Sequence, residues 1–155
     1  MKSRVVTQRC EFECAYIMEK DLSKDYILGD EPDEGFELNS HRYKVEASVV
    51  SSKDSNIVVE FRKLKQYLQA TLPDKCFLSS ASGERLPGEL SVISGLKSLG
   101  ISVIELYFPL SAENLVTYIA EQLQLLLTRM YDNCVTVVSV KLRENNDSFV
   151  EWVNK

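Results

Sequence analysis

Four residues with reactive side chains lie at or next to the ends of predicted strands or helices. They are His41, Asp74, Lys75 and Glu144. An imidazole can bind a metal ion or transfer a proton near neutral pH. Lys75 could act as a base if its amine is desolvated, because burial lowers the pKa of a lysine. Glu144 ends the apolar face of a predicted strand, where a carboxylate is costly unless N–H donors reach it. It is therefore suited to accept hydrogen bonds from a flat, nitrogen-rich ring.

Each of these residues also has a simpler interpretation. His41 is the only histidine of the chain, and it could be half-buried and bonded to the backbone. Lys75 could be solvated or paired with a carboxylate, and Glu144 could be a solvated strand-end residue beside a turn. The sequence leaves these alternatives open.

Periodicity predicts the elements that position these residues. In the segment 39–50, Tyr43, Val45, Ala47 and Val49 alternate with polar residues, which is typical of a strand with one buried face. His41 lies on the buried side of that strand. In the last long strand, alternation predicts that Glu144 shares a face with Val138, Val140 and Leu142. The predicted strands cover residues 5–18, 39–51, 136–144 and 149–153, and the predicted helices cover 59–70 and a segment beginning at Ser111, a good N-cap.

This order indicates an α+β fold in one domain, residues 1–155. We expect a four-stranded antiparallel sheet with two helices on one face, in the order ββααββ. An extra short strand at residues 102–108 and a possible short helix at 92–99 lie between the two long helices. A long acidic loop occupies residues 21–37. Unpaired outer strands favour association with further copies of the chain.

Composition excludes several classes of protein. The net charge is -5 and the basic residues are scattered, so a nucleic-acid partner is not expected. No apolar run reaches the length of a membrane span, and the N-terminus lacks a signal-peptide core, so we expect a cytoplasmic protein without a membrane partner. The four cysteines fit reduced core residues better than a disulfide framework; they are Cys10, Cys14, Cys76 and Cys134.

Six short motifs in one order resemble the 6-pyruvoyl-tetrahydropterin synthase family, which includes the bacterial 6-carboxytetrahydropterin synthase (QueD). F-E-C-A-Y (residues 12–16) is similar to the family's F-S-A-A-H, and N-S-H-R-Y-K-V (39–45) is similar to H-G-H-N-Y-K-V. The others are V-V-E-F-R-K-L-K (58–65), P-D-K-C-F-L (73–78), L-S-A-E-N-L (110–115) and V-K-L-R-E-N (140–145). The resemblance covers nearly the whole chain and implies the tunnelling fold, with trimers that stack into hexamers and a pocket between subunits.

The resemblance also implies roles for individual residues. Glu144 corresponds to the glutamate that anchors the pterin ring, and Asp74 with Lys75 corresponds to an Asp-His pair that assists proton transfer. Three histidines hold zinc in the family; here Tyr16, Asn39 and His41 occupy their positions. Gly35 stands where the family has a catalytic cysteine.

We therefore expect a diverged family member that binds a pterin or purine-like ligand and lacks the zinc-dependent lyase chemistry. The alternative is an active lyase acting on dihydroneopterin triphosphate with a remodelled metal site, in which Cys14 and an acidic residue of the 21–37 loop join His41. A third interpretation is a structural oligomer whose pocket is vestigial.

Overall fold

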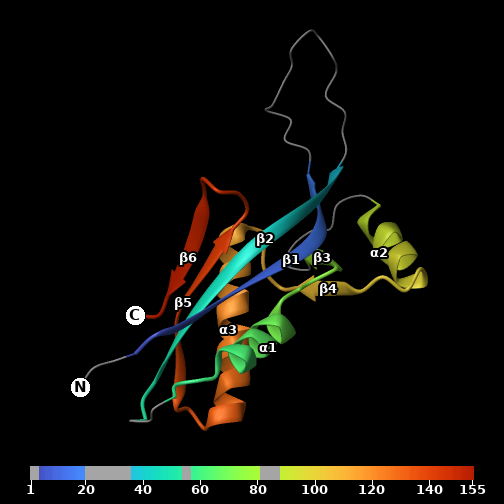
Figure 1. Cartoon of the computed structure of the whole chain (residues 1–155). Helices are drawn as coiled ribbons and strands as arrows, with labels where there is room; N and C mark the ends of the chain where they lie inside the picture. The colour runs from blue at the N-terminus through green and yellow to red at the C-terminus, as the bar shows by residue number, and fades with distance from the viewer. Residues whose placement is uncertain (1–3, 20–35, 54–56, 81–87) are drawn as a thin grey trace.

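The computed structural model describes residues 4–19, 36–53, 57–80 and 88–155. Two long strands begin the chain, helices and short strands alternate through its middle, and a hairpin ends it (Figure 1). The elements are β1 (Val6–Glu19), β2 (Phe36–Ser51), α1 (Phe61–Thr71), β3 (Cys76–Ser80), α2 (Glu89–Ser98), β4 (Val103–Leu106), α3 (Ala112–Tyr131), β5 (Val135–Arg143) and β6 (Phe149–Val153).

The sheet differs from the predicted one in strand number and in direction. It has six strands in the order β4-β3-β1-β2-β5-β6. The pairs β1–β2, β2–β5 and β5–β6 are antiparallel, but β3 and β4 add to the β1 side in parallel. The prediction of a four-stranded antiparallel sheet is therefore wrong, and the α+β class is confirmed as a mixed sheet with helices.

The short strand and short helix expected between the long helices are present as β4 and α2. The strand β3 was missed, although its five residues, C-F-L-S-S, are almost entirely buried. The predicted 21–37 loop falls largely on residues 20–35, which lie outside the described residues, as does Gly35.

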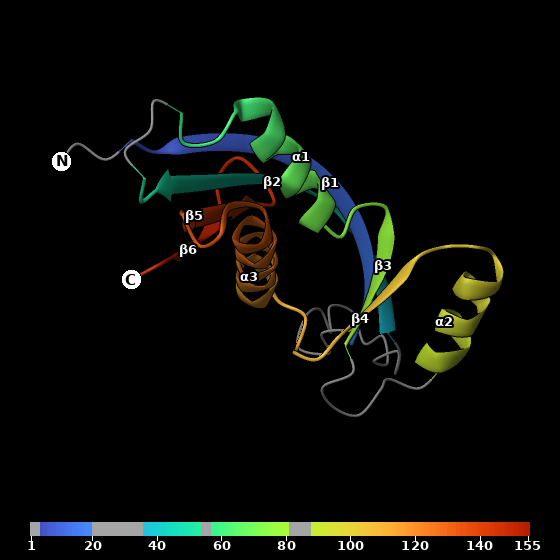
Figure 2. The same cartoon turned by 90° about the horizontal axis from the view of Figure 1, so that it is seen from below.

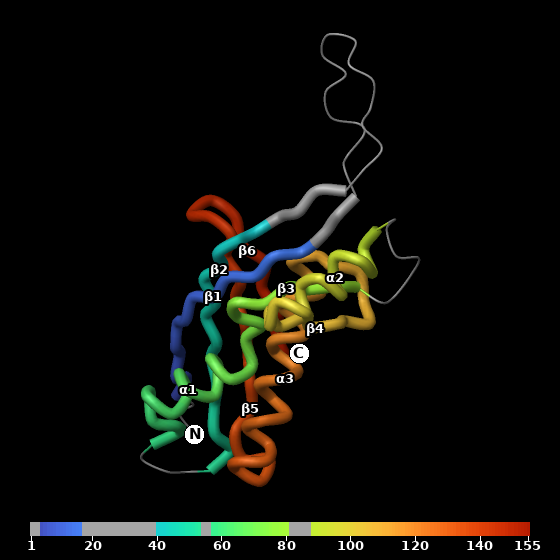
Figure 3. Tube along the Cα trace, turned by 90° about the vertical axis from the view of Figure 1, so that its right-hand side faces the viewer, coloured from blue at the N-terminus to red at the C-terminus, as the bar shows by residue number. Residues whose placement is uncertain are grey.

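Helices α1 and α3 pack on one face of the sheet, as predicted, and enclose the main core. The apolar faces of β1, β2 and β5 meet Leu64 and Leu68 of α1 and Ile119, Leu123 and Leu127 of α3, all five with no measurable exposure. Figure 3 shows α1 beside β1 and α3 running along β5. Of the helices that the structure describes, none combines the length and apolarity of a membrane span.

Helix α2 packs on the other face of the sheet. Its Ile93 forms a small second core with Phe77 of β3, against which Ala15 and Val103 also pack. Ala15 and Phe77 alternate with Cys14 and Cys76, which face the main core, so they point to the opposite side. Figure 2 shows α2 lying apart from α1 and α3, beside β3 and β4.

Helix α3 begins as the sequence predicted. Ser111 is its N-cap, and the side-chain oxygen accepts a hydrogen bond from the Asn114 N–H at 3.1 Å. Glu113 lies in the first turn, where its negative charge meets the positive end of the helix dipole.

A β-bulge in β5 determines which residues of that strand face the core. Ser139 pairs with Ser48 and Val137 pairs with Val49, so Val138 is an extra residue without a partner on β2. Val137 is buried before the bulge and Val140 after it. The predicted place of Val138 on the shared face of Val140, Leu142 and Glu144 is wrong, because the bulge shifts the alternation by one residue.

Candidate functional site

The hairpin of β1 and β2 brings together the three positions at which the family resemblance implies zinc ligands. Tyr16 is the cross-strand partner of Asn39, and Cys14 is the partner of His41. The ring of Tyr16 stacks on the imidazole of His41, with centroids 5.5 Å apart and an interplanar angle of 24°. Cross-strand partners in an antiparallel pair share a face, and so do residues two apart along one strand. Because Tyr16 is two residues from Cys14, the partner of His41, Tyr16 and His41 lie on the same face.

Glu144 also reaches His41 within the same chain. It follows the last residue of β5, and its Oε1 lies 2.7 Å from Nδ1 of His41. The carboxylate can only accept, so the imidazole N–H donates. The structure thus joins the predicted ring anchor to the predicted metal ligand within one chain.

Two tyrosines complete this cluster, and one of them was missed. The hydroxyl of Tyr43 donates a hydrogen bond to that of Tyr16, and the rings of Tyr43 and His41 lie 5.8 Å apart. Burial raises the pKa of Tyr16 above its usual value; the hydrogen bond from Tyr43 lowers it in part, and the charge of Glu144 raises it further. Burial also raises the pKa of Tyr43. Both phenols therefore stay neutral at physiological pH. The sequence placed Tyr43 on the face of His41 but suggested only a core residue.

Cys14 lies opposite His41, but its thiol is poorly suited to chemistry. Burial raises the pKa of Cys14 to about 12, with smaller contributions from Cys76 and the charge of Asp74. A thiol is reactive and binds metal as the thiolate, so Cys14 is held in its unreactive form. Among the described residues, no three His, Cys, Asp or Glu side chains gather as metal ligands would.

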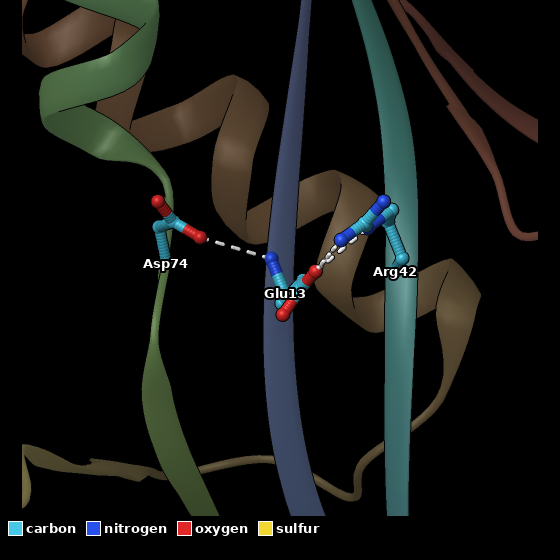
Figure 4. Close-up of polar contacts among 3 residues, drawn as sticks. All are labelled: Glu13, Arg42 and Asp74. Carbon is cyan, nitrogen blue, oxygen red and sulfur yellow. Dashed lines mark hydrogen bonds and ion pairs between the residues drawn. The ribbon is translucent and has the colours of Figure 1, made fainter.

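Asp74 and Lys75 lie elsewhere on the sheet. Oδ1 of Asp74 accepts a hydrogen bond from the Glu13 N–H at 2.9 Å, and the Lys75 N–H donates to the Glu13 carbonyl at 2.7 Å. The carboxylate of Glu13 in turn accepts from the guanidinium of Arg42 on β2, at 2.7 Å from Nε (Figure 4). No contact among the described residues joins Asp74 or Lys75 to His41.

Lys75 occupies the turn that starts β3. Its φ of 52° is left-handed, a conformation that is uncommon for a residue with a side chain. Its side chain is exposed, so the protomer alone does not supply the desolvation that a lysine base requires. The backbone contacts of Lys75 and the carboxylate of Asp74 fasten the beginning of β3 to β1.

The space beside the tyrosines is small within one protomer. A cavity of about 30 Å³ lies next to Tyr16 and Tyr43, closed by Leu78 and by residues 110–112 and 115. Such a volume holds about one water molecule and cannot enclose a bicyclic ring. Glu144, by contrast, is 46% exposed, so a ligand can approach its carboxylate from the outside.

One comparison with known proteins identifies a family. The sequence pattern of the family described as 6-pyruvoyl tetrahydropterin synthase matches residues 6–155. A search of the curated proteins finds no match.

Solved structures have the same fold over nearly the whole chain. An uncharacterized protein from Wolinella succinogenes is 20% identical, with a TM-score of 0.58 over 99% of this chain and 100% of its own. A catalytic-residue mutant of the 6-pyruvoyltetrahydropterin synthase of Plasmodium vivax is 14% identical, with a TM-score of 0.61 over 96% and 97%. The Caenorhabditis elegans 6-pyruvoyl tetrahydropterin synthase is 13% identical, with a TM-score of 0.57 over 100% and 98%.

Proposed function

Because the chain belongs to the 6-pyruvoyl tetrahydropterin synthase family, we propose that it binds a pterin or purine-like ring at Glu144 and lacks zinc-dependent lyase chemistry. The observation that carries the proposal is the pair of His41 and Glu144. Nδ1 of the imidazole holds Oε1 of the carboxylate at 2.7 Å. This contact orients the carboxylate, whose second oxygen can accept from a ring N–H.

The donor set supports the absence of zinc. Zinc prefers imidazole nitrogen, thiolate sulfur and carboxylate oxygen. Of the three aligned positions only His41 offers such a donor, because Tyr16 carries a phenol whose pKa is raised by burial and position 39 is an asparagine. The residues present therefore do not fit the metal, and no step of the function depends on it.

The site of one protomer is open and supports a pocket completed by a second copy. The small cavity beside Tyr16 cannot hold the ring, and the exposed side of Glu144 is available to one. The outer strands of the described sheet, β4 and β6, are edges at which copies could associate. Assembly into a trimer or hexamer, catalytic roles for Asp74 and Lys75, and a cytoplasmic location remain predictions.

Calorimetric titration with pterin tests the ring anchor. We expect wild-type protein to bind pterin and Glu144→Gln to bind it at least about tenfold more weakly, because the amide loses the charge and one acceptor. Glu121→Gln, a change of the same kind on the exposed side of α3, is the matched control and should leave the affinity unchanged. Equal affinity in Glu144→Gln and wild type would show that the anchor is assigned wrongly.

A second candidate is an active lyase with a remodelled metal site. The contact that favours it is the same pair, because a carboxylate bonded to one nitrogen of a histidine often orients the other nitrogen toward a metal. Stoichiometric zinc in purified protein that disappears in His41→Ala, together with turnover of dihydroneopterin triphosphate, would support this candidate. Protein without zinc and without turnover supports the ligand-binding function.

A further inference from the structure

Helix α2 is attached to the rest of the molecule by a small contact surface. Of its ten residues, only Glu89 and Ile93 are buried, whereas α3 contributes six buried residues to the main core. Figures 1 and 2 show α2 beside β3 and β4, apart from the other two helices. Ile93 and Phe77 form a core of two buried side chains, against which four half-buried ones pack: Ala15, Val92, Leu96 and Val103.

The surface beneath α2 is a row of apolar side chains that crosses three strands. Ala15 of β1 is the cross-strand partner of Phe77 of β3, and Phe77 is the partner of Val103 of β4. Cross-strand partners share a face, so all three side chains point to the side that α2 covers. Phe77 is 3% exposed in the presence of α2 and would meet solvent without it.

The strands that carry this row are held in the sheet by contacts that do not involve α2. Asp74 and Lys75 fasten the start of β3 to Glu13 of β1. The short strand β4 pairs with β3 along its whole length. The sheet can therefore keep its form while α2 leaves it.

The two ends of α2 allow it to move separately from the sheet. Gly88 and Gly100 flank the helix with left-handed φ values of 79° and 78°, which glycine adopts without strain. The N–H of Gly100 donates to the Lys97 carbonyl at 3.0 Å, so the C-terminal cap belongs to the helix itself and does not tie it to β3 or β4.

A buried polar contact fixes the docked position of the other end. Oγ of Ser79 on β3 donates a hydrogen bond to Oε1 of Glu89 at 3.1 Å, and both residues are buried. Glu89 is the first residue of α2, where the helix dipole favours a negative charge. The closed arrangement is therefore specific, although its apolar contact is small.

We propose that α2 is a lid that opens as a unit while the main core stays folded, and that its opening uncovers the row of Ala15, Phe77 and Val103. Segments with few buried apolar contacts open at a lower free energy than the core of the same protein. An isolated helix of this length is marginal in water, so its backbone N–H groups exchange with solvent when the lid opens. The proposal does not depend on the ring-binding function, because α2 and the ring site lie on opposite faces of the sheet.

Hydrogen exchange followed by mass spectrometry tests the lid. We expect the amides of residues 93–98 in α2 to exchange at least about 100-fold faster than those of residues 119–127 in α3. Low concentrations of urea should speed exchange in α3 much more than in α2, because opening of the lid exposes far less surface than global unfolding. Equal rates and equal urea dependence in the two helices would show that α2 opens only when the whole protein unfolds, and would overturn the proposal.

Single substitutions test which contacts hold the lid closed. Ile93→Ala removes most of the apolar contact with Phe77 and should speed exchange in α2 at least about tenfold while leaving α3 unchanged. Leu90→Ala, a change of the same kind at a position 62% exposed, is the matched control and should alter the rate less than about threefold. Ser79→Ala removes the hydrogen bond to Glu89 and should also speed exchange in α2, which keeps the test available if Ile93→Ala does not fold. Equal acceleration of α2 and α3, or no acceleration of α2 in either variant, would overturn the proposal.

Discussion

Gln124 of α3 links the helix to the bulged strand, and its removal should destabilise the protein measurably. Its Oε1 accepts a hydrogen bond from the Val137 N–H at 2.8 Å, and its Nε2 donates to the Val135 carbonyl at 3.1 Å. Both valines are buried, with exposures of 0% and 2%. These are the backbone groups just before Val138, where the bulge interrupts the ladder to β2. Val135 and Val137 also lie beyond the last pair of β5 with β6, Ser139 with Val153, so the Gln124 side chain bonds to backbone groups that β6 does not reach.

Gln124→Ala leaves both backbone groups without that partner. An unsatisfied buried polar group costs about 1 to 3 kcal/mol. Gln124 itself is only partly buried, so water can replace part of what is lost, and we expect the free energy of unfolding to fall by about 2 to 4 kcal/mol. For a domain of this size the melting temperature changes by about 3 °C per kcal/mol, so it should fall by about 6 to 12 °C.

Urea unfolding followed by circular dichroism measures this loss. The protein concentration must be equal for all variants, because association would make the measured stability depend on concentration. An unchanged slope of unfolding free energy against urea concentration would confirm that only stability has changed. The control is Gln122→Ala, a change of the same kind on the same helix. The side chain of Gln122 forms no hydrogen bond with any other residue that the structure describes, so this substitution should lower the free energy of unfolding by about 0.5 kcal/mol or less. A loss in Gln124→Ala no larger than in this control would refute the argument.

Two further predictions concern Asp74 and Cys14. Asp74→Ala removes the acceptor of the Glu13 N–H and should lower the free energy of unfolding by about 1 kcal/mol, whereas Asp74→Asn keeps an acceptor oxygen and should cost less; equal losses in urea unfolding would contradict this role. Folding raises the pKa of the Cys14 thiol from 9.0 to about 12, so between these values the unfolded chain releases a proton that the folded chain retains. The free energy of unfolding should fall as the pH rises through this range, and Cys14→Ala should reduce that fall; an unchanged pH dependence would disprove the assignment.

The sequence predicted the antiparallel hairpins well because their signals are local. Alternation fixes the faces of β1 and β2, and once the hairpin pairs, the alignment of Tyr16 with Asn39 follows from the same pattern. The N-cap at Ser111 is also local, and it was placed correctly. The position of His41 on the buried side needed no knowledge of the rest of the chain.

The parallel part of the sheet was missed because its signal is not local. β3 is five residues long, too short for its periodicity to separate a buried strand from a loop. Its partner on β1 is distant in sequence: Cys76 pairs with Cys14. The role of Asp74 was equally hidden, since its acceptor oxygen finds a backbone N–H on β1 only after β3 has joined the sheet.

The bulge shows how a local irregularity decides a functional position. Val135 and Val137 are buried, and simple alternation from them would put Val140, Leu142 and Glu144 on the outer face. The extra residue Val138 reverses the alternation, so Glu144 emerges on the face of His41. The sequence predicted the correct side for Glu144 without the correct reason.

On the proposed function, the contact between His41 and Glu144 gives both residues a role that does not depend on a metal. An imidazole without its partner histidines is a poor metal site, but it can still hold a carboxylate in one orientation. Glu144 alone, 46% exposed at a strand end, would be free to rotate, and ordering it would reduce its affinity for a ring. The ring of Tyr16, whose hydroxyl accepts a hydrogen bond from Tyr43, stacks on the inner side of the imidazole. On the proposed function, Tyr16 stands where the family resemblance implies a histidine, and its stacking on the imidazole supports an anchor that does not depend on a metal.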